Sequence, residues 1–337
     1  MHYFHFDNLV WNYYYDKDKD HTTYDKNETI NESGNCFVDE TFFSFLSPNG
    51  VIRIEGNSNT KLLVSFSTFL NCSNLNTTSS NGGCIYMNKG NCISYRVCST
   101  KCNTLNIRSY CSVSARYLSN TSLYLTSIHL GNSEYSTFCL SEGYTNSVSN
   151  VNVTDNTAQG KTAFFVGRCK TYINYSYFRG NKATSSHAIF AYEYIFSNET
   201  YSCIFLNNSV NESENGLFYF EGSGNFIIRE CIIKYNKYSN LIYSVGANSD
   251  FYVSFINCLI EGTDLGYPGD AVLEVETTNS LSLEFRLYPP RECQTENIIM
   301  NDDLQDRYRR CLEDKNALEF KFGIRPCLYH ILTIGSK

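Results

Sequence analysis

Proline, charged residues and long apolar runs are all scarce in this chain of 337 residues. Proline occurs only five times, and Lys, Arg, Asp and Glu together make up 18% of the sequence. So low a charged fraction argues against a disordered chain, because disordered segments depend on charge and polarity to stay unfolded. No apolar stretch approaches the roughly 20 residues that a membrane-spanning helix needs. We therefore expect a folded chain without a membrane span.

Basic runs and export signals are also missing. The net charge is −7 and no cluster of Lys and Arg stands out, so nucleic acid is not an expected partner. The first residues, Met1–Phe6, have neither the basic start nor the clear apolar core of a signal peptide. The sequence by itself therefore indicates no export route.

Catalytic signatures are sparse. Carbohydrate-active enzymes built on repeats need clustered or paired carboxylates, yet between Lys61 and Ser249 the only aspartate is Asp155. No histidine lies near a Ser or Cys nucleophile motif, and no Gly-rich phosphate loop joins a strand to a helix. The sequence places no two of the following glutamates on one face as a pair: Glu193, Glu199, Glu212, Glu214, Glu221 and Glu230. We predict no catalytic residues, no cofactor-binding residues and no cofactor.

Fifteen cysteines are present, an odd number that does not suit a complete disulfide framework. The spacing Cys98-x3-Cys102 occurs, but no pair of CxxC motifs with a distal histidine accompanies it. We therefore predict no metal site. Five cysteines are crowded enough along the chain for one or two bridges: Cys84, Cys92, Cys98, Cys102 and Cys111.

What the chain does contain is one short pattern that recurs. Its five copies end 25, 27, 28 and 27 residues apart, at 151–156, 176–181, 203–208, 231–236 and 258–263. A second apolar run follows each copy after a polar spacer, at Thr162–Val166, His187–Tyr192, Leu217–Phe220, Leu241–Val245 and Ala271–Val275. A repeat of this length is typical of a solenoid, in which each coil stacks on the next.

The repeated runs should be strands. They are five to eight residues long, which is too short for helices. The many Tyr (27) and Phe (23) residues fit a pleated surface and also favour strands. Asparagine tolerates φ > 0 and suits a tight corner between strands. Most runs end at such a residue: Asn103, Asn132, Asn156, Asn181, Asn208 and Asn236.

One column of the repeat carries cysteine. Alternate residues of a strand face opposite sides, so the first and third residues of each copy should point inward. Cys203, Cys231 and Cys258 then share a column, and we predict a structural stack of buried thiols there. Successive coils lie about 4.8 Å apart, so a disulfide within the stack is the alternative, although its geometry is demanding. Stacking also buries the apolar face and pairs the strand backbone, which one coil cannot do alone.

Several motifs resemble a known kind of repeat. The segment Asn81–Tyr86 (Asn-Gly-Gly-Cys-Ile-Tyr), the apolar-x-x-Asn corners and the later apolar-Tyr/Phe runs resemble right-handed parallel β-helix repeats. In these repeat motifs, residues 36–276 resemble polymorphic outer-membrane-protein-like and adhesin-like surface proteins of parasitic protists. The resemblance implies a pectate-lyase-like (pectin lyase-like) architecture. It also implies display at a cell surface or secretion, and a role in adhesion.

The predicted fold is all-β, a right-handed, single-stranded parallel β-helix of about nine coils with a short C-terminal helical extension. Residues 1–35 should form a polar and aromatic lead-in that is exposed or partly ordered. Residues 36–276 should form the β-helix repeat domain. Residues 277–337 should form a cap or tail with a short helix near 302–316, because Asn301–Asp303 can begin a helix.

We expect a non-catalytic binding or adhesion module that recognises host or self glycans or proteins through exposed Tyr, Asn and Ser. The sequence indicates no particular binding residues. Two alternatives remain open. One is a carbohydrate-active enzyme, either a lyase or a hydrolase, with an unfamiliar site. The other is a truncated family member with no independent role.

Sequons add little to this. Ten Asn-x-Ser/Thr sequons occur, barely more than the roughly seven that chance predicts for this composition. They do not establish secretion. Six of them, all within the repeats, are candidate N-glycosylation sites: Asn71, Asn120, Asn152, Asn174, Asn198 and Asn207.

Overall fold

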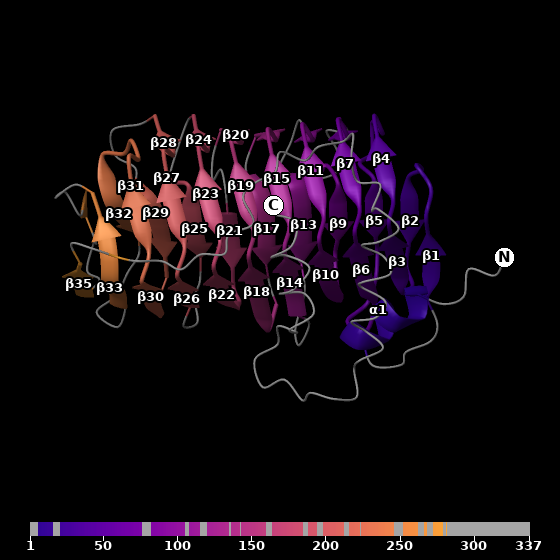
Figure 1. Ribbon diagram of the computed structural model, residues 1–337, viewed down its shortest axis with the longest axis horizontal. Coiled ribbons are helices and arrows are strands. Elements are labelled where there is room, and N and C mark those ends of the chain that lie inside the picture. Colours follow the sequence, from indigo (N-terminus) through magenta and orange to yellow (C-terminus); the bar gives the residue numbers. More distant parts are fainter. Residues whose placement is uncertain are drawn as a thin grey trace, which may run out of the picture. The chain divides into compact units, whose positions relative to one another are not determined.

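The structure, a computed structural model, describes residues 6–15, 21–75, 82–104, 108–114, 120–134, 136–141, 143–159, 164–184, 188–193, 198–211, 216–222, 224–245, 252–261, 266–267, 272–278 and 281. Within these residues the chain is a nearly all-β parallel solenoid with a single helix. Its strands lie side by side in coils that follow the chain from one end of the solenoid to the other (Figure 1). The predicted right-handed parallel β-helix is confirmed.

Each coil adds a strand to as many as four parallel sheets, which we name A, C, D and B in the order in which the chain visits them. Sheet A is the longest. Its strands are β1 (Thr22–Tyr24), β3 (Cys36–Asp39), β6 (Lys61–Ser65), β10 (Asn91–Tyr95), β14 (Asn120–Tyr124), β18 (Thr145–Ser149), β22 (Lys170–Asn174), β26 (Asn198–Tyr201), β30 (Asn225–Arg229), β33 (Tyr252–Ile260) and β35 (Val272–Thr277).

Sheets C and D follow after two tight corners. Sheet C contains β4 (Phe42–Ser44), β7 (Thr68–Leu70), β11 (Cys98–Thr100), β15 (Ser127–His129), β19 (Asn152–Thr154), β23 (Tyr177–Arg179), β27 (Ile204–Leu206), β31 (Ile232–Lys234) and the end of β33. Sheet D contains β8 (Ser73–Asn74), β12 (Asn103–Thr104), β16 (Asn132–Ser133), β20 (Thr157–Ala158), β24 (Lys182–Ala183) and β28 (Ser209–Val210).

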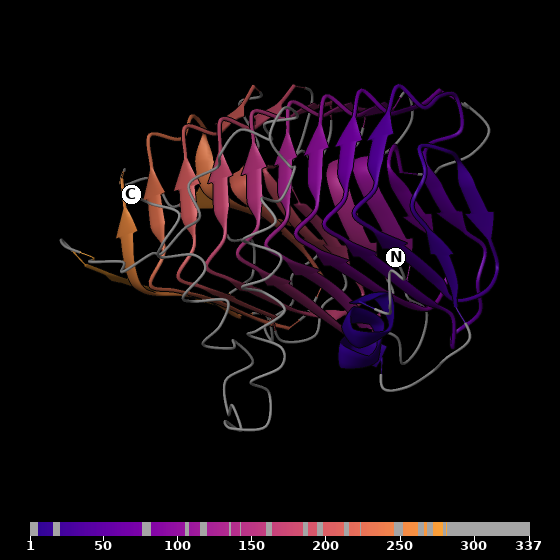
Figure 2. The same ribbon diagram turned by 45° about the vertical axis from the view of Figure 1, so that its right-hand side comes forward.

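Sheet B completes each coil before the chain returns to sheet A. It contains β2 (Ile30–Glu32), β5 (Ile52–Ile54), β9 (Ile85–Met87), β13 (Arg108–Ser114), β17 (Ser136–Ser141), β21 (Phe164–Gly167), β25 (Phe190–Glu193), β29 (Gly216–Glu221), β32 (Asn240–Val245) and β34 (Gly266–Tyr267). Figure 2 shows the same ladders after a 45° turn.

About seven coils are regular. Six of them, from β6 to β29, have a strand in all four sheets, and in the next coil a bridge between Lys237 and Ser209 replaces the sheet D strand. The predicted number of about nine is therefore somewhat too high. In the described residues, the coils nearer the two ends lack a strand in one or more sheets, so the four-sheet pattern does not extend over the whole repeat region.

Two columns of left-handed residues turn the coil at its tight corners. Between sheets A and C the positive φ falls on residues such as Tyr175 (49°) and Glu230 (52°), and between sheets C and D on residues such as Asp155 (54°) and Asn207 (52°). The sequence suggested that the asparagines at the ends of the runs adopt φ > 0 themselves. This is wrong for Asn156 and its equivalents, because the residue before each of them has the positive φ.

The interior is filled by columns of like side chains. Phe178 and Phe205 stack with ring centroids 5.3 Å apart and planes 7° apart, and Phe43 stacks on Phe69 in the same way at 5.0 Å. Phe190 from sheet B meets Phe205 edge-on at 4.8 Å. The repeat places large apolar residues on large ones, and this buries the face that a single coil would leave in water.

The helix α1 (Phe6–Tyr15) lies beside the first coils, as both views show (Figures 1 and 2). Trp11 is fully buried and its ring lies 6.0 Å from that of Phe37 in sheet A. Tyr15 Oη donates to the carbonyl oxygen of Leu62 at 2.7 Å. The described part of the N-terminal lead-in is therefore packed on the solenoid, and β1 and β2 extend the ladders ahead of residue 36.

At the other end, the predicted cap or tail at 277–337 lies outside the described residues, apart from Thr277, Thr278 and Leu281. Its expected helix near 302–316 falls entirely outside them.

Candidate binding faces of the solenoid

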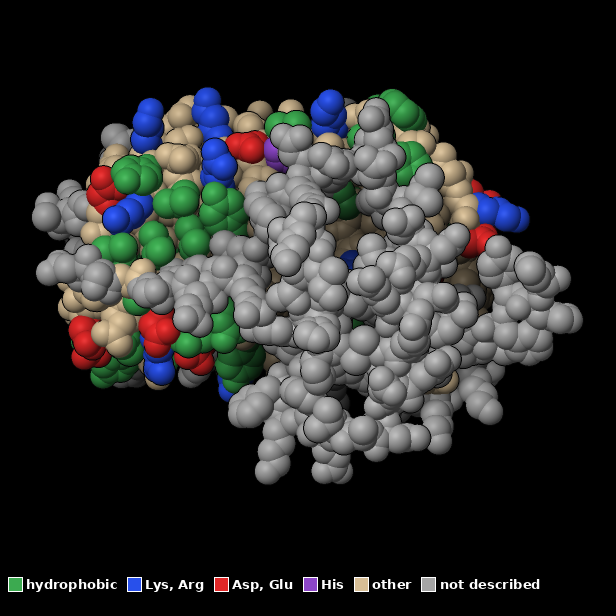
Figure 3. Space-filling model, viewed as in Figure 1, with side chains coloured by type: hydrophobic (Ala, Val, Ile, Leu, Met, Phe, Trp, Pro, Cys, Tyr) green, Lys and Arg blue, Asp and Glu red, His purple; other side chains and the backbone are tan. Residues whose placement is uncertain are grey.

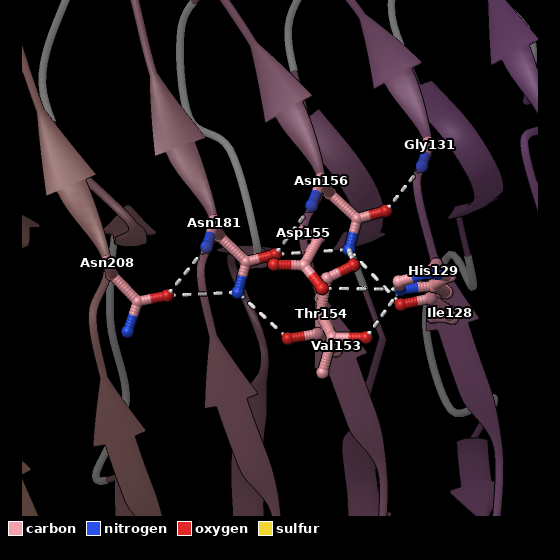
Figure 4. Close-up of polar contacts among 9 residues, drawn as sticks. All are labelled: Ile128, His129, Gly131, Val153, Thr154, Asp155, Asn156, Asn181 and Asn208. Carbon is pink, nitrogen blue, oxygen red and sulfur yellow. Dashed lines mark hydrogen bonds and ion pairs between the residues drawn. The ribbon is translucent and has the colours of Figure 1, made fainter. Parts of the chain in front are cut away.

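An asparagine ladder runs inside the corner between sheets C and D (Figure 4). Asn181 Oδ1 accepts from Asn156 N at 3.2 Å and from Asn156 Nδ2 at 3.0 Å. Asn208 Oδ1 accepts in the same way from Asn181 N and Nδ2, at 3.1 and 3.0 Å. Asn181 Nδ2 also donates to the carbonyl oxygen of Val153 at 2.8 Å. These three amides are fully buried and fully used, so the ladder stabilises the corner and leaves nothing for a ligand.

Cysteines take this corner position in earlier coils. Cys72 and Cys102 follow the positive-φ residues Asn71 and Lys101, as Asn156 follows Asp155 in the ladder. Cys102 Sγ contacts the carbonyl oxygens of Phe69 at 3.6 Å and Thr100 at 3.5 Å. The thiol here donates to strand carbonyls, which is the task that the asparagine amide performs in later coils.

The three cysteines of the predicted stack lie at the corner between sheets A and C, and all are fully buried thiols. Cys203 N donates to Cys231 Sγ at 3.4 Å, and Cys231 Sγ contacts the carbonyl oxygen of Arg229 at 3.2 Å. Cys258 Sγ makes the same contact with the carbonyl oxygen of Ile256 at 3.5 Å. The three thiols therefore lie together at one corner, where they hydrogen-bond to backbone groups and form no disulfides with one another.

The bridges expected within the crowded cysteine stretch do not form. Cys84, Cys92, Cys102 and Cys111 are thiols, and Cys98 is disulfide-bonded to none of them. Closeness along the chain is a poor guide in a solenoid, because spatial neighbours lie one repeat apart. Burial raises the pKa of the Cys84 and Cys102 thiols and raises that of Cys92 to about 12.

A small polar cluster lies on the outer side of sheet C. His129 Nδ1 is 2.9 Å from Thr154 Oγ1 and 3.6 Å from Asp155 Oδ2 (Figure 4). Both contacts use the same ring nitrogen, and no other described side chain makes a hydrogen bond or ion pair to this histidine. The arrangement is a surface contact between an imidazole and a carboxylate, and not the relay of nucleophile, base and carboxylate that acyl transfer needs.

Gly180 makes room for this cluster, and its replacement by alanine should be costly. Its φ is +65°, and a Cβ there would overlap Asp155 Oδ1. We expect Gly180→Ala to lower the free energy of unfolding by about 1–2 kcal/mol, measured by urea denaturation, through backbone strain and displacement of the carboxylate. In the Asp155→Ala background the same change should cost only the backbone part, about 1 kcal/mol. Equal costs in the two backgrounds would contradict the overlap.

The candidate glycosylation residues divide by exposure. Asn152 is 8% exposed and Asn198 is 4% exposed. Asn198 Oδ1 accepts a hydrogen bond from Thr171 N inside sheet A, so a bulky, solvated glycan does not fit this position in the folded chain. Four of the six are at least partly exposed: Asn71, Asn120, Asn174 and Asn207.

The outer face of sheet A carries polar and aromatic side chains in β22, β26 and β30. The parallel register places Tyr172 beside Glu199, Asn174 beside Tyr201, and Tyr201 beside Arg229. We call the partly exposed outward set the sheet A grid: Tyr172, Asn174, Glu199, Tyr201, Ile227 and Arg229. The alternation of these residues with buried ones could be found in the sequence. Which of them are neighbours could not, because register depends on the lengths of the intervening loops.

Side chains around the grid add rings and charge. Tyr175 is 39% exposed, and its ring meets that of Tyr201 edge-on, with centroids 5.6 Å apart and planes 79° apart. Lys170 Nζ lies 5.1 Å from the ring centroid of Tyr172. The Nε atom of Arg229 is buried and hydrogen-bonds to no described residue. A carboxylate, an amide, a guanidinium and phenol rings thus lie within three neighbouring coils.

Apolar side chains gather on the outer face of sheet C over β23, β27 and β31 (Figure 3). The register aligns Tyr177, Ile204, Ile232 and Leu259 in one column along the solenoid. With Leu206, these partly exposed residues form what we call the sheet C patch. The register places Arg179 and Lys234 on either side of Leu206, so basic side chains border the patch. Exposed apolar surface of this kind is typical of interaction sites.

Two of the six glutamates that the sequence did not pair are neighbours in sheet B. In sheet B, the register of β25 and β29 places Glu193 opposite Glu221 in neighbouring coils, so two of these residues do share a column. Tyr219 Oη donates to Glu221 Oε2 at 2.9 Å. The sequence did not indicate this pair because the two residues are 28 positions apart and only the sheet register makes them neighbours.

In the described part of the chain, no group of three or more His, Cys, Asp or Glu residues is placed to hold a metal ion. The helix found there, α1, has ten residues, about half the length that a membrane span requires.

No protein-family model matches this chain. No match is found among curated proteins either. The function is therefore inferred from the two outward faces and from the chemistry of their side chains.

Proposed function

We propose that this chain is a non-catalytic binding module of the adhesion type, displayed at a surface or secreted, that recognises glycans or proteins. The observation that carries this proposal is the pair of outward faces, the sheet A grid and the sheet C patch, on a frame whose strands pair coil to coil. A rigid frame holds side chains in place before a partner arrives and so reduces the entropy lost on binding. Aromatic rings beside amide and charged groups suit both classes of partner.

The resemblance of the repeats to adhesin-like surface proteins of parasitic protists supports the same proposal. In such a setting the partners are glycans or proteins of a host cell or of the organism's own surface.

The full chain, labelled with a fluorophore, should bind saturably to intact cells or to an immobilised glycan array. Ile232→Asp in the sheet C patch and Tyr201→Ala in the sheet A grid should each be tested, with Tyr235→Ala as the control, since Tyr235 is exposed but outside both sets. At least one face variant should reduce binding by tenfold or more, about 1.4 kcal/mol. Absence of binding to cells and to glycans alike would rule out the proposal.

One observation favours a second candidate, a carbohydrate-active enzyme. The backbone register of β25 and β29 makes Glu193 and Glu221 neighbours in adjacent coils, and glycoside hydrolysis uses a pair of carboxylates. Incubation with a panel of neutral and acidic polysaccharides should then release reducing ends or unsaturated products. Glu221→Gln should lower kcat by at least about 100-fold. A wild-type chain without measurable turnover would eliminate this candidate.

A further inference from the structure

We infer that the sheet A grid is a binding site for a neutral oligosaccharide, with Tyr201 as the ring on which a sugar packs. The inference rests on the proposed function and specifies both the ligand class and the place. It follows from the rings, the uncommitted hydrogen-bonding groups, the charge balance and the dimensions of this part of sheet A.

The aromatic part of the site is Tyr201 with its neighbours. The ring lies at the centre of one row of the grid, between Asn174 and Arg229 in the flanking coils. The ring of Tyr175, at the adjacent corner, packs against it at nearly a right angle, and Tyr201 remains partly exposed. The C–H groups on one face of a pyranose form an apolar surface that packs on such a ring and is removed from water there.

Several polar groups of the grid form no hydrogen bond with the described residues. The side chains of Glu199 and Asn174 make no hydrogen bond or ion pair with a described residue, and no ion pair joins Glu199 to Arg229. Arg229 Nε is buried without a described partner, and a donor in that state costs free energy until an acceptor arrives. Sugar hydroxyls both donate and accept, so they can pair with a carboxylate, an amide and a guanidinium at once.

The charge of the grid favours a neutral ligand. Glu199 and Arg229 have opposite charges, and so do Lys170 and Glu230, the charged residues that adjoin the grid along β22 and β30. An acidic saccharide would meet two carboxylates without a surplus of cations. The sheet C patch differs, because its side chains are aliphatic apart from Tyr177 and its border is basic. It offers few groups that bind hydroxyls, so it does not suit a neutral sugar.

The dimensions fit a short oligosaccharide. The three coils of the grid span about 10 Å along the solenoid, since neighbouring strands are about 4.8 Å apart. About two or three sugar rings laid along the axis would cover Tyr172, Tyr201 and Arg229 in turn. Beyond the grid, the outward positions of β14 and β18 continue with hydroxyl and amide groups, for example Ser147 and Ser149.

The test is isothermal titration calorimetry of the full chain with cellohexaose, mannohexaose and chitohexaose as neutral probes and hexagalacturonate as the acidic probe. We expect at least one neutral hexasaccharide to bind and hexagalacturonate not to bind. Tyr201→Ala should weaken binding by about tenfold or more. Glu199→Gln and Arg229→Gln should each weaken it by about threefold to tenfold. Tyr235→Ala, an exposed tyrosine outside the grid, should leave it unchanged, and unfolding curves should show that all variants are folded.

Several outcomes would overturn the inference. If a neutral hexasaccharide binds equally well to wild type and to all three grid variants, the site is wrong while the proposed function stands. If only hexagalacturonate binds, the ligand class is wrong. If no hexasaccharide binds while the chain still binds cells, the inference fails and a protein partner is indicated. If neither sugars nor cells are bound, the inference and the proposed function fail together.

Discussion

Raising the pH from about 8 to about 10 should destabilise this protein by several kcal/mol, at about 1 kcal/mol for each buried thiol. Burial raises the pKa of Cys169 to about 11 and of Cys92 to about 12. Six further thiols have a raised pKa, with burial or a hydrogen bond from a neighbouring cysteine as the main cause: Cys36, Cys72, Cys84, Cys102, Cys231 and Cys258.

Stability falls with rising pH because the unfolded chain releases its thiol protons at a lower pH than the folded chain does. In the unfolded chain these thiols ionise near pH 9, whereas in the folded chain they stay neutral to a higher pH. Their contribution to stability is therefore fully present below about pH 9 and is lost as the pH rises toward the folded pKa values. Urea denaturation of the fully reduced protein at a series of pH values measures this loss directly.

Cys231→Ser is the matched control for the thiol effect. Serine already occupies the same column one coil before Cys203, where Ser176 Oγ accepts from Val151 N at 3.2 Å, so a hydroxyl can serve the corner. Because serine does not titrate in this range, the variant should lose less stability between about pH 8 and 10, by about 1 kcal/mol. A free energy of unfolding that stays constant over this range in the wild type would contradict the burial of the thiols.

Asn181→Ala should lower the free energy of unfolding by about 3–4 kcal/mol. The substitution removes the acceptor of Asn156 N and Nδ2 and the donor to the carbonyl oxygen of Val153, all in a site that water does not reach. Each buried group left without a partner costs about 1–3 kcal/mol. Urea denaturation gives the loss, and hydrogen exchange at the Asn156 amide should accelerate in parallel.

Asn236→Ala supplies the comparison. Asn236 Oδ1 accepts from Asn208 N and Nδ2, both at 2.9 Å, but its side chain is partly exposed. Water can replace the lost amide there, so the expected cost is about 1 kcal/mol. Equal losses for the two variants would mean that the buried ladder contributes no more than an exposed hydrogen bond does.

The fold could be predicted because the repeat is a physical requirement of the solenoid. Each inward position must stack on its equivalent, so Cys203, Cys231 and Cys258 share a column, as do Phe178, Phe205 and Ile233. The corners were predicted only in part. The asparagines mark them correctly, yet the left-handed conformation belongs to the preceding residue, because the asparagine side chain must point inward to join the ladder.

The candidate sites could not be predicted to the same extent. Tyr172, Glu199 and Arg229 look unrelated in the sequence, since they lie 27 and 30 residues apart with loops between them. The same holds for Glu193 and Glu221, which are neighbours only through the register of sheet B. For the sequons, the local sequence suggested a site that the structure does not allow. The motif at Asn198 is intact, but its side chain accepts a hydrogen bond inside sheet A.

The sequence by itself determined that this protein is a parallel β-solenoid, because a hydrophobic repeat of this length can be buried only by stacking coils. It also determined which residue types occupy the inward columns. The tertiary structure alone decided which outward residues are neighbours. Outward side chains are under no stacking constraint, and their neighbourhood depends on loop lengths and on the hydrogen-bonded register between coils, which no local pattern encodes.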